Sequence, residues 1–251
     1  MSIYLHNSDT AVLLHQSSFR HYLEAHATEK MEEMFRLVPF ARDFHEGDWI
    51  DEEYYKRHII EAIIRIKLNN EVDAYCLYKI DQNDRYVFGE LAKYLAEEYS
   101  HDTLFLSDLS RFGIKQEEVS KTSPFFSTQL LMGYLYLSIN KSGVLADIIW
   151  NWFVEWYSNR YNQGITKKAG ENFGIDKVEG GLAHLRIDKN EEHGSLMFSL
   201  IEKTVKGQDD RDRIKEYLTN FVKLIGMYFQ ELYEATIGTS AKPQNIDKQD
   251  Y

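Results

Sequence analysis

Apolar residues recur at intervals of three and four positions along most of the chain, which is the spacing that places side chains on one face of a helix. Prolines number only three, and no Asn-Gly or Asp-Gly pair joins two alternating segments into a hairpin. The pattern therefore predicts an all-α domain of about seven helices over residues 1–237, with a flexible polar tail at 238–251. The predicted helices span residues 17–37, 51–78, 85–112, 126–138, 144–161, 177–206 with an interruption, and 210–237.

Composition and charge narrow the functional class. The formal net charge of −11 repels the phosphates of nucleic acids and anionic membranes. The single cysteine, Cys76, excludes both an internal disulfide and a cysteine metal cage. No basic and apolar signal segment occupies residues 1–16, and no apolar run approaches the length of a membrane span. We therefore expect a soluble, cytoplasmic protein that binds neither nucleic acid nor membrane.

Carboxylates interrupt the apolar face of the segment 85–112. Glu98 and Asp102 lie within the apolar arc, and His101 lies at its edge. A buried carboxylate is unfavourable unless it is paired, protonated or bound to a metal. Glu-x-x-His is the unit with which helical bundles provide a bridging carboxylate and an imidazole to a di-iron or di-manganese pair. A hydrogen-bonded pair without metal is the competing interpretation. The apolar arc consists of Phe88, Leu91, Leu95, Phe105, Leu106 and Leu109.

Two other predicted helices also carry an acid next to an apolar face. Glu155 adjoins the tryptophan-rich face of the helix at 144–161, although a position at the rim would let it reach solvent past Asn159. Glu61 lies among isoleucines, where an i,i+4 ion pair with Arg65 explains it equally well. The aromatic residues around Glu155 form either plain core or the wall of an apolar substrate pocket.

A fourth segment combines two histidines with acids. His184 and Asp188 are four residues apart and share one helical face, so both could bind one metal. A regular helix next places Glu191 on that face, whereas a π-bulge or short loop around residues 189–190 would bring His193 round instead. The sequence leaves this choice open. Acids and histidines inserted on four helices together predict an internal carboxylate–histidine metal site.

Two segments resemble a known group of helical proteins. Residues 37–53 (LVPFARDFHEGDWIDEE) are similar to the early segment of the TenA/PqqC-type, heme-oxygenase-like fold. Residues 97–114 (EEYSHDTLFLSDLSRFGI) resemble the Glu-Glu-x-x-His stretch of its metal-binding branch. That branch comprises the heme-oxygenase-like diiron oxidases and oxygenases, including the CADD-like proteins. The resemblance covers residues 17–237 and implies a heme-oxygenase-like helical bundle.

The resemblance also implies a ligand set and cofactors. Two Fe(II) ions, or manganese in their place, would react with O2 as co-substrate. In the family, the third histidine ligand lies closer in sequence to its aspartate than His193 lies to Asp188. The third histidine is therefore the ligand at which this chain departs from the family. Asp102 and Asp108 would orient an imidazole. The metal ligands implied by position are Glu61, Glu98, His101, Glu155, His184, Asp188 and, with the departure noted, His193.

The expected function is that of an O2-dependent nonheme diiron oxidase or oxygenase. Its substrate would be a small amphipathic molecule, such as an amino-acid derivative or fatty acid, in specialised-metabolite or cofactor biosynthesis, with a reductase and a homodimeric state as expected partners. One alternative is a CADD-like, self-modifying p-aminobenzoate synthase, for which Tyr94 lies near the site. Others are a metal-free TenA/PqqC-like enzyme that uses Glu98 or Glu155 as acid or base, and a helical interaction protein without chemistry.

Overall fold

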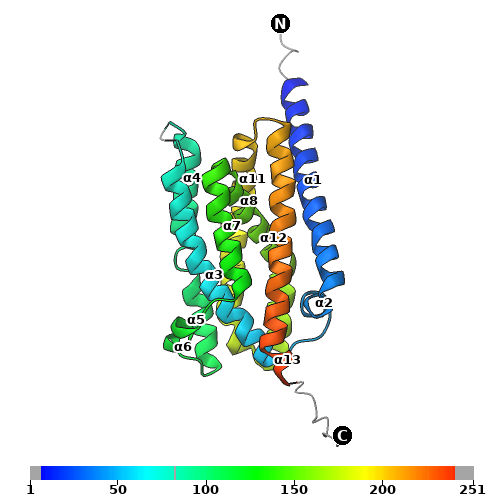
Figure 1. The fold of residues 1–251 in the computed structure, drawn as a ribbon, viewed down its shortest axis with the longest axis vertical. Helices are drawn as coiled ribbons and strands as arrows, with labels where there is room; N and C mark the ends of the chain where they lie inside the picture. The colour runs from blue at the N-terminus through cyan, green and yellow to red at the C-terminus, as the bar shows by residue number, and fades with distance from the viewer. Residues whose placement is uncertain (1–6, 82, 241–251) are drawn as a thin grey trace, which may run out of the picture.

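The computed structural model describes residues 7–81 and 83–240, and no strand occurs among them. This confirms the all-α prediction. The longer helices correspond to the predicted segments, and shorter helices are added between them (Figure 1). The helices are α1 (Asn7–Leu37), α2 (Pro39–His45), α3 (Glu52–Lys79), α4 (Arg85–Glu98), α5 (Asp102–Arg111), α6 (Gln116–Lys121), α7 (Phe126–Ser142), α8 (Leu145–Tyr157), α9 (Gln163–Phe173), α10 (Glu179–Glu191), α11 (His193–Thr204), α12 (Gln208–Ala235) and α13 (Ile237–Ser240).

Long amphipathic helices build the core. On α12 the buried residues Ile214, Leu218, Phe221 and Ile225 follow one another at intervals of three and four, and this face packs against α1, α7 and α8. Helix α3 packs against α4, α5 and α7. In Figure 1, α1 and α12 run side by side along the long axis of the molecule. The predicted periodicity therefore marks the faces that the bundle buries.

Two predicted helices are interrupted at residues that matter for the site. The segment 85–112 is not one helix: α4 ends at Glu98, and α5 begins at Asp102. The amide of His101 donates to the carbonyl of Glu98 at 3.1 Å, so a tighter i,i+3 turn replaces the α-helical pattern there. The second interruption is at Glu192, where φ is 52° and the left-handed conformation separates α10 from α11.

The helix predicted at 144–161 ends earlier than expected, at Tyr157. After α8 the chain passes through a π-helical turn, Ser158–Asn162, and goes on as α9. A π-bulge or short loop around residues 189–190 was one of the alternatives that the sequence left open. In the structure α10 runs to Glu191, and the break comes at the left-handed residue Glu192. Across the part of the chain that is described, no helix combines the length and the apolar character that a membrane crossing needs. Most of the predicted tail, residues 241–251, lies outside the described residues.

Candidate metal centre

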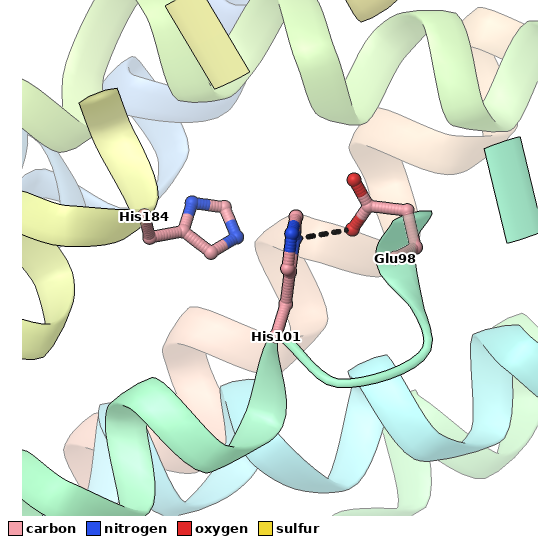
Figure 2. Close-up of side chains that lie close together, drawn as sticks. All are labelled: Glu98, His101 and His184. Atoms are coloured by element: carbon pink, nitrogen blue, oxygen red, sulfur yellow. Dashed lines mark ion pairs between the residues drawn. The ribbon is translucent and has the colours of Figure 1, made fainter. Parts of the chain in front are cut away.

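Five side chains from five places in the chain meet inside the bundle. Glu98 ends α4, His101 precedes α5, Glu155 lies on α8, His184 on α10 and His193 on α11. They form two groups that could each hold a cation, one with His101 and His184 and one with Glu155 and His193; Glu98 belongs to both. Within each group the donor atoms lie within 4.8 Å of one another. Figure 2 shows the first group, with the His101 ring between Glu98 and His184.

The two oxygens of Glu98 face different histidines. Oε2 is 2.9 Å from Nδ1 of His101, and Oε1 is 3.0 Å from Nδ1 of His193. The same Nδ1 of His193 lies 3.8 Å from Oε1 of Glu155. A carboxylate with one oxygen in each group has the arrangement of a bridging ligand between two ions.

Opposite charges outweigh burial at the centre of this cluster. Burial by itself would raise the pKa of Glu98, but hydrogen bonds from His101 and His193 lower it to about 2. Burial would lower the pKa of His193, but hydrogen bonds to Glu155 and Glu98 raise it to about 11. In the absence of a metal, a proton on His193 therefore occupies the place between these carboxylates that a cation can take.

The left-handed residue Glu192 decides how His193 is presented. Because α10 stops at Glu191 and α11 starts at His193, the imidazole is fully buried against α4 and α8 rather than turned away. The sequence left Glu191 and His193 as alternatives, and the structure brings His193 into the cluster. The side chains of residues 188–191 lie outside the described part of the chain, so Asp188 as a ligand stays a prediction.

Two residues next to the cluster were not assigned ligand or supporting roles in the sequence. Glu97 Oε2 lies 3.1 Å from Nε2 of His193, so the second ring nitrogen is also held by a carboxylate. The buried Tyr94 donates its hydroxyl to Oε1 of Glu155 at 3.1 Å. Glu97 is the first residue of the Glu97-Glu98 doublet, and that doublet was the only feature of the sequence that pointed to a role for Glu97 at the cluster.

Asp108 positions a helix rather than an imidazole. Its carboxylate accepts hydrogen bonds from the amides of Gly180 at 2.7 Å and Gly181 at 2.8 Å, in the first turn of α10. These amides have no acceptor within the helix, so Asp108 acts as a cap supplied by another element. Asp102, the second acid expected to orient an imidazole, instead lies 3.4 Å from Nζ of Lys67. Asp108 therefore fixes the helix that carries His184.

The structure does not bring Glu61 into either group. Its side chain is fully buried, with Oε2 2.7 Å from Nη1 of Arg57 and Oε1 accepting the amide of Phe125 at 2.9 Å. The expected surface pair with Arg65 is not formed either. Of the two positions that the sequence left open for Glu61, the structure has the buried one, where an arginine and a backbone amide satisfy the carboxylate.

A pocket of about 160 Å³ adjoins the cluster. Glu98, Glu155 and His184 line it together with aromatic side chains, among them Trp150 and Phe153 of α8. The sequence left two roles open for the aromatic residues of α8, pocket wall and plain core, and the structure has residues in each. Trp150 and Phe153 wall the pocket, whereas Trp152 and Trp156 stack on each other with ring centroids 6.3 Å apart, outside the lining.

The donor set matches what iron or manganese accepts. Carboxylate and imidazole are their usual protein ligands, and the cluster offers two carboxylates and three imidazoles without any thiolate. The internal position, with His193 and Glu155 buried, shields such ions from bulk water. These residues therefore fit a dinuclear metal centre of the kind that the resemblance implies.

No protein-family model matches the sequence, and no curated protein matches it. Solved structures do. A domain of unknown function with a heme oxygenase-like fold from Shewanella denitrificans is 17% identical, with a TM-score of 0.77 over 92% of this chain and 98% of the other. A TenA homolog from Pseudomonas syringae is 8% identical, with a TM-score of 0.68 over 85% and 92%. A TenA homologue from P. horikoshii is 14% identical, with a TM-score of 0.64 over 86% and 98%. The chain therefore has the heme-oxygenase-like, TenA-type fold.

Proposed function

We propose that the protein is an O2-dependent nonheme diiron oxidase or oxygenase that acts on a small amphipathic molecule in specialised-metabolite or cofactor biosynthesis. The single observation that carries the proposal is the carboxylate of Glu98, whose two oxygens face two different histidine-containing groups. A structural ion pair needs only one such partner. A carboxylate shared between two cation-binding groups is what a dinuclear centre requires.

The residues of the chain have distinct tasks in this function. Glu98 would bridge, His101 and His184 would complete one metal position, and Glu155 and His193 would complete the other. When bound, the two Fe(II) ions supply the electrons that reduce O2. Glu97 holds Nε2 of His193 at 3.1 Å and so fixes the ring with Nδ1 toward the centre.

The pocket next to the centre supplies the environment for the reaction. Its aromatic walls, which include Trp150 and Phe153, exclude water and hold the apolar part of a substrate beside Glu98 and Glu155. A pocket lined by the same carboxylates as the candidate metal centre favours an enzyme over a helical interaction protein. A reductase that supplies electrons for repeated turnover is part of the proposal.

Metal content after anaerobic loading with Fe(II) and desalting tests this function. We expect about two irons per chain, with optical bands that appear when O2 is admitted, because two donor groups share Glu98. Loading with an equimolar mixture of Fe(II) and Mn(II) tells which metal the centre prefers. Near-zero binding of both metals would contradict the proposal and favour a metal-free enzyme that uses Glu98 or Glu155 as acid or base.

The isosteric variant Glu61→Gln is a matched control for a buried acid. Glu61 is at least as buried as the cluster residues but is held by Arg57 and the amide of Phe125. We expect this variant to keep full iron content. Loss of iron in a variant that is still folded by circular dichroism would restore Glu61 to the ligand set that the resemblance implied.

A second candidate function is oxidation of the chain's own Tyr94. The observation that favours it is the hydrogen bond from the buried Tyr94 hydroxyl to Glu155, which places this phenol at the candidate centre. Mass spectrometry of the peptide that contains Tyr94, before and after exposure of the Fe(II)-loaded protein to O2, tests it. A mass change confined to this residue is expected for self-modification, and an unchanged peptide excludes it.

A further inference from the structure

The pocket contains a cationic side chain without an anionic partner. Arg65 of α3 lines the pocket, and its Nη1 is buried with no hydrogen-bond partner. None of the described carboxylates forms an ion pair with it. Its contact is with Tyr228, whose ring centroid lies 4.1 Å from Cζ of Arg65. The hydroxyl of Tyr228 also accepts a hydrogen bond from Arg65, but a neutral phenol does not balance the charge, and Nη1 is left without an acceptor.

The acid that would ordinarily pair with Arg65 is engaged elsewhere. Glu61 is four residues before Arg65 on the same helix, which is the spacing of a helical ion pair. Both of its oxygens are used, one by Arg57 at 2.7 Å and the other by the amide of Phe125 at 2.9 Å. Arg57 also lies over an aromatic ring, that of Phe125. The two arginines therefore have similar surroundings, but only Arg57 has a carboxylate.

Arg65 is also the source of positive charge in this pocket. Among the described lining residues it is the only lysine or arginine. His58, which lines the pocket too, is neutral because burial lowers its pKa well below the usual value. A buried, charged donor left without an acceptor is unfavourable, and a bound anion would remove that penalty.

We propose that Arg65 binds the carboxylate of an amphipathic substrate and thereby defines the substrate class as a small apolar carboxylic acid. The inference rests on the proposed function, since it concerns the same pocket. The planar guanidinium matches a carboxylate with two parallel hydrogen bonds. A phosphate group would bring a second negative charge into a pocket that already contains Glu98 and Glu155. The apolar body of the acid would then lie along the aromatic walls, within reach of the candidate metal centre.

The cavity limits the size of such an acid. At about 160 Å³ it resembles the cavities of ~150 Å³ that hold one benzene molecule, so a single ring or a short chain fits. A pair of probes, benzoate and benzamide, each a single ring with one polar group, matches this size. They differ in charge and not in shape. Their comparison therefore reports the contribution of the carboxylate alone.

Isothermal titration calorimetry of the full chain with both probes tests the inference, first with the metal removed by a chelator and then after anaerobic Fe(II) loading. The acid is expected to bind at least about tenfold more tightly than the amide, since hydrogen bonds to charged groups are strong. In Arg65→Met the acid should lose this advantage, while the affinity for the amide changes by less than about twofold. Arg65→Lys should fall between, because an ammonium cannot make the two parallel bonds.

Arg57→Lys is the matched control, since Arg57 lies on the same helix over an aromatic ring but does not line the pocket. It should leave the affinities for both probes unchanged. Equal affinity of the wild-type chain for acid and amide would overturn the inference even if Arg65→Met fails to fold. Acid binding that requires iron and has the same affinity in Arg65→Met would also overturn the inference, because the metal would then hold the carboxylate. Acid binding that depends on Arg65 in a chain that takes up no iron would support the inference and contradict the proposed diiron function.

Discussion

At the scale of single residues, Glu98 connects the two halves of the candidate centre. One of its oxygens faces His101 and the other faces His193, at 2.9 and 3.0 Å. His184 belongs to only one of the two groups, and Glu155 and His193 belong only to the other. Removal of different ligands should therefore have unequal effects on metal content, which a set of unrelated ion pairs would not produce.

We expect Glu98→Ala to lose nearly all bound iron, because both groups use this carboxylate. His184→Ala and His193→Ala should each keep roughly half of the wild-type iron, since each removes a ligand from one position. Elemental analysis after anaerobic loading measures this, with circular dichroism to establish that each variant is folded. Full iron content in Glu98→Ala, or equal and complete loss in all three variants, would contradict the shared arrangement.

At the scale of elements, the contact between α5 and α10 determines where His184 is held. A Cβ on Gly180 would lie 2.0 Å from the carbonyl oxygen of Leu104, so the two helices approach each other there more closely than any other residue allows. Asp108 caps the first turn of α10 at the same place. The close approach and the cap together fix the start of the helix, and His184 follows about one turn later.

Gly180→Ala should destabilise the protein by about 1–3 kcal/mol and weaken the metal position that contains His184, because backbone must move to admit the methyl group. The control is Gly133→Ala on α7, where an added Cβ meets nothing within 4 Å. That change should stabilise by roughly 0.5–1 kcal/mol, as alanine is the better helix former. Chemical denaturation gives both values. A Gly180→Ala protein as stable as wild type would show that α5 and α10 are not tightly fitted.

At the scale of the whole molecule, a buried acid pair links stability to pH. The carboxyl groups of Asp73 on α3 and Asp147 on α8 contact each other, and both are buried. Asp73 accepts hydrogen bonds from Asn69 and Asn151, whereas Asp147 accepts none from an amide or hydroxyl of the described residues. Burial, and for Asp73 also the charge of Asp147, raises the pKa of each acid above the ordinary value. The core therefore holds a proton that the unfolded chain releases.

The sign of the pH dependence follows from this retained proton. Between the usual pKa of an aspartate and the raised value, the folded state binds more protons than the unfolded state, so the free energy of unfolding falls as pH rises. Each unit by which the pKa is raised contributes about 1.4 kcal/mol to this fall. Asp147→Asn removes one of the two acids, so its stability should decline less than that of wild type between about pH 5 and pH 8. Urea denaturation across this range measures the difference, and parallel curves would contradict a shared proton.

Local pattern was enough to find the helices and the buried acids on them. Helical periodicity is a property of neighbouring residues, so the sequence by itself determined that the chain is all-α and that Glu61, Glu98 and Glu155 interrupt apolar faces. The structure has all three on the inside of the bundle, with Glu61 fully buried, Glu155 nearly so and Glu98 partly so. The turn between α4 and α5 was missed because it is a short departure within a segment of otherwise regular spacing. An interruption within 177–206 was predicted, but its place at the left-handed Glu192 was not.

Only the tertiary structure decided which partner each of these acids meets. Glu61 meets Arg57 and the amide of Phe125, whereas Glu98 meets histidines that are brought in by other segments. Glu98 and Glu61 look alike in the sequence, because burial depends on the face of one helix. The partner of a buried acid depends instead on how helices distant in sequence approach one another, and periodicity contains no information about that approach. The same packing leaves Arg65 in the pocket without an ion pair to any described carboxylate.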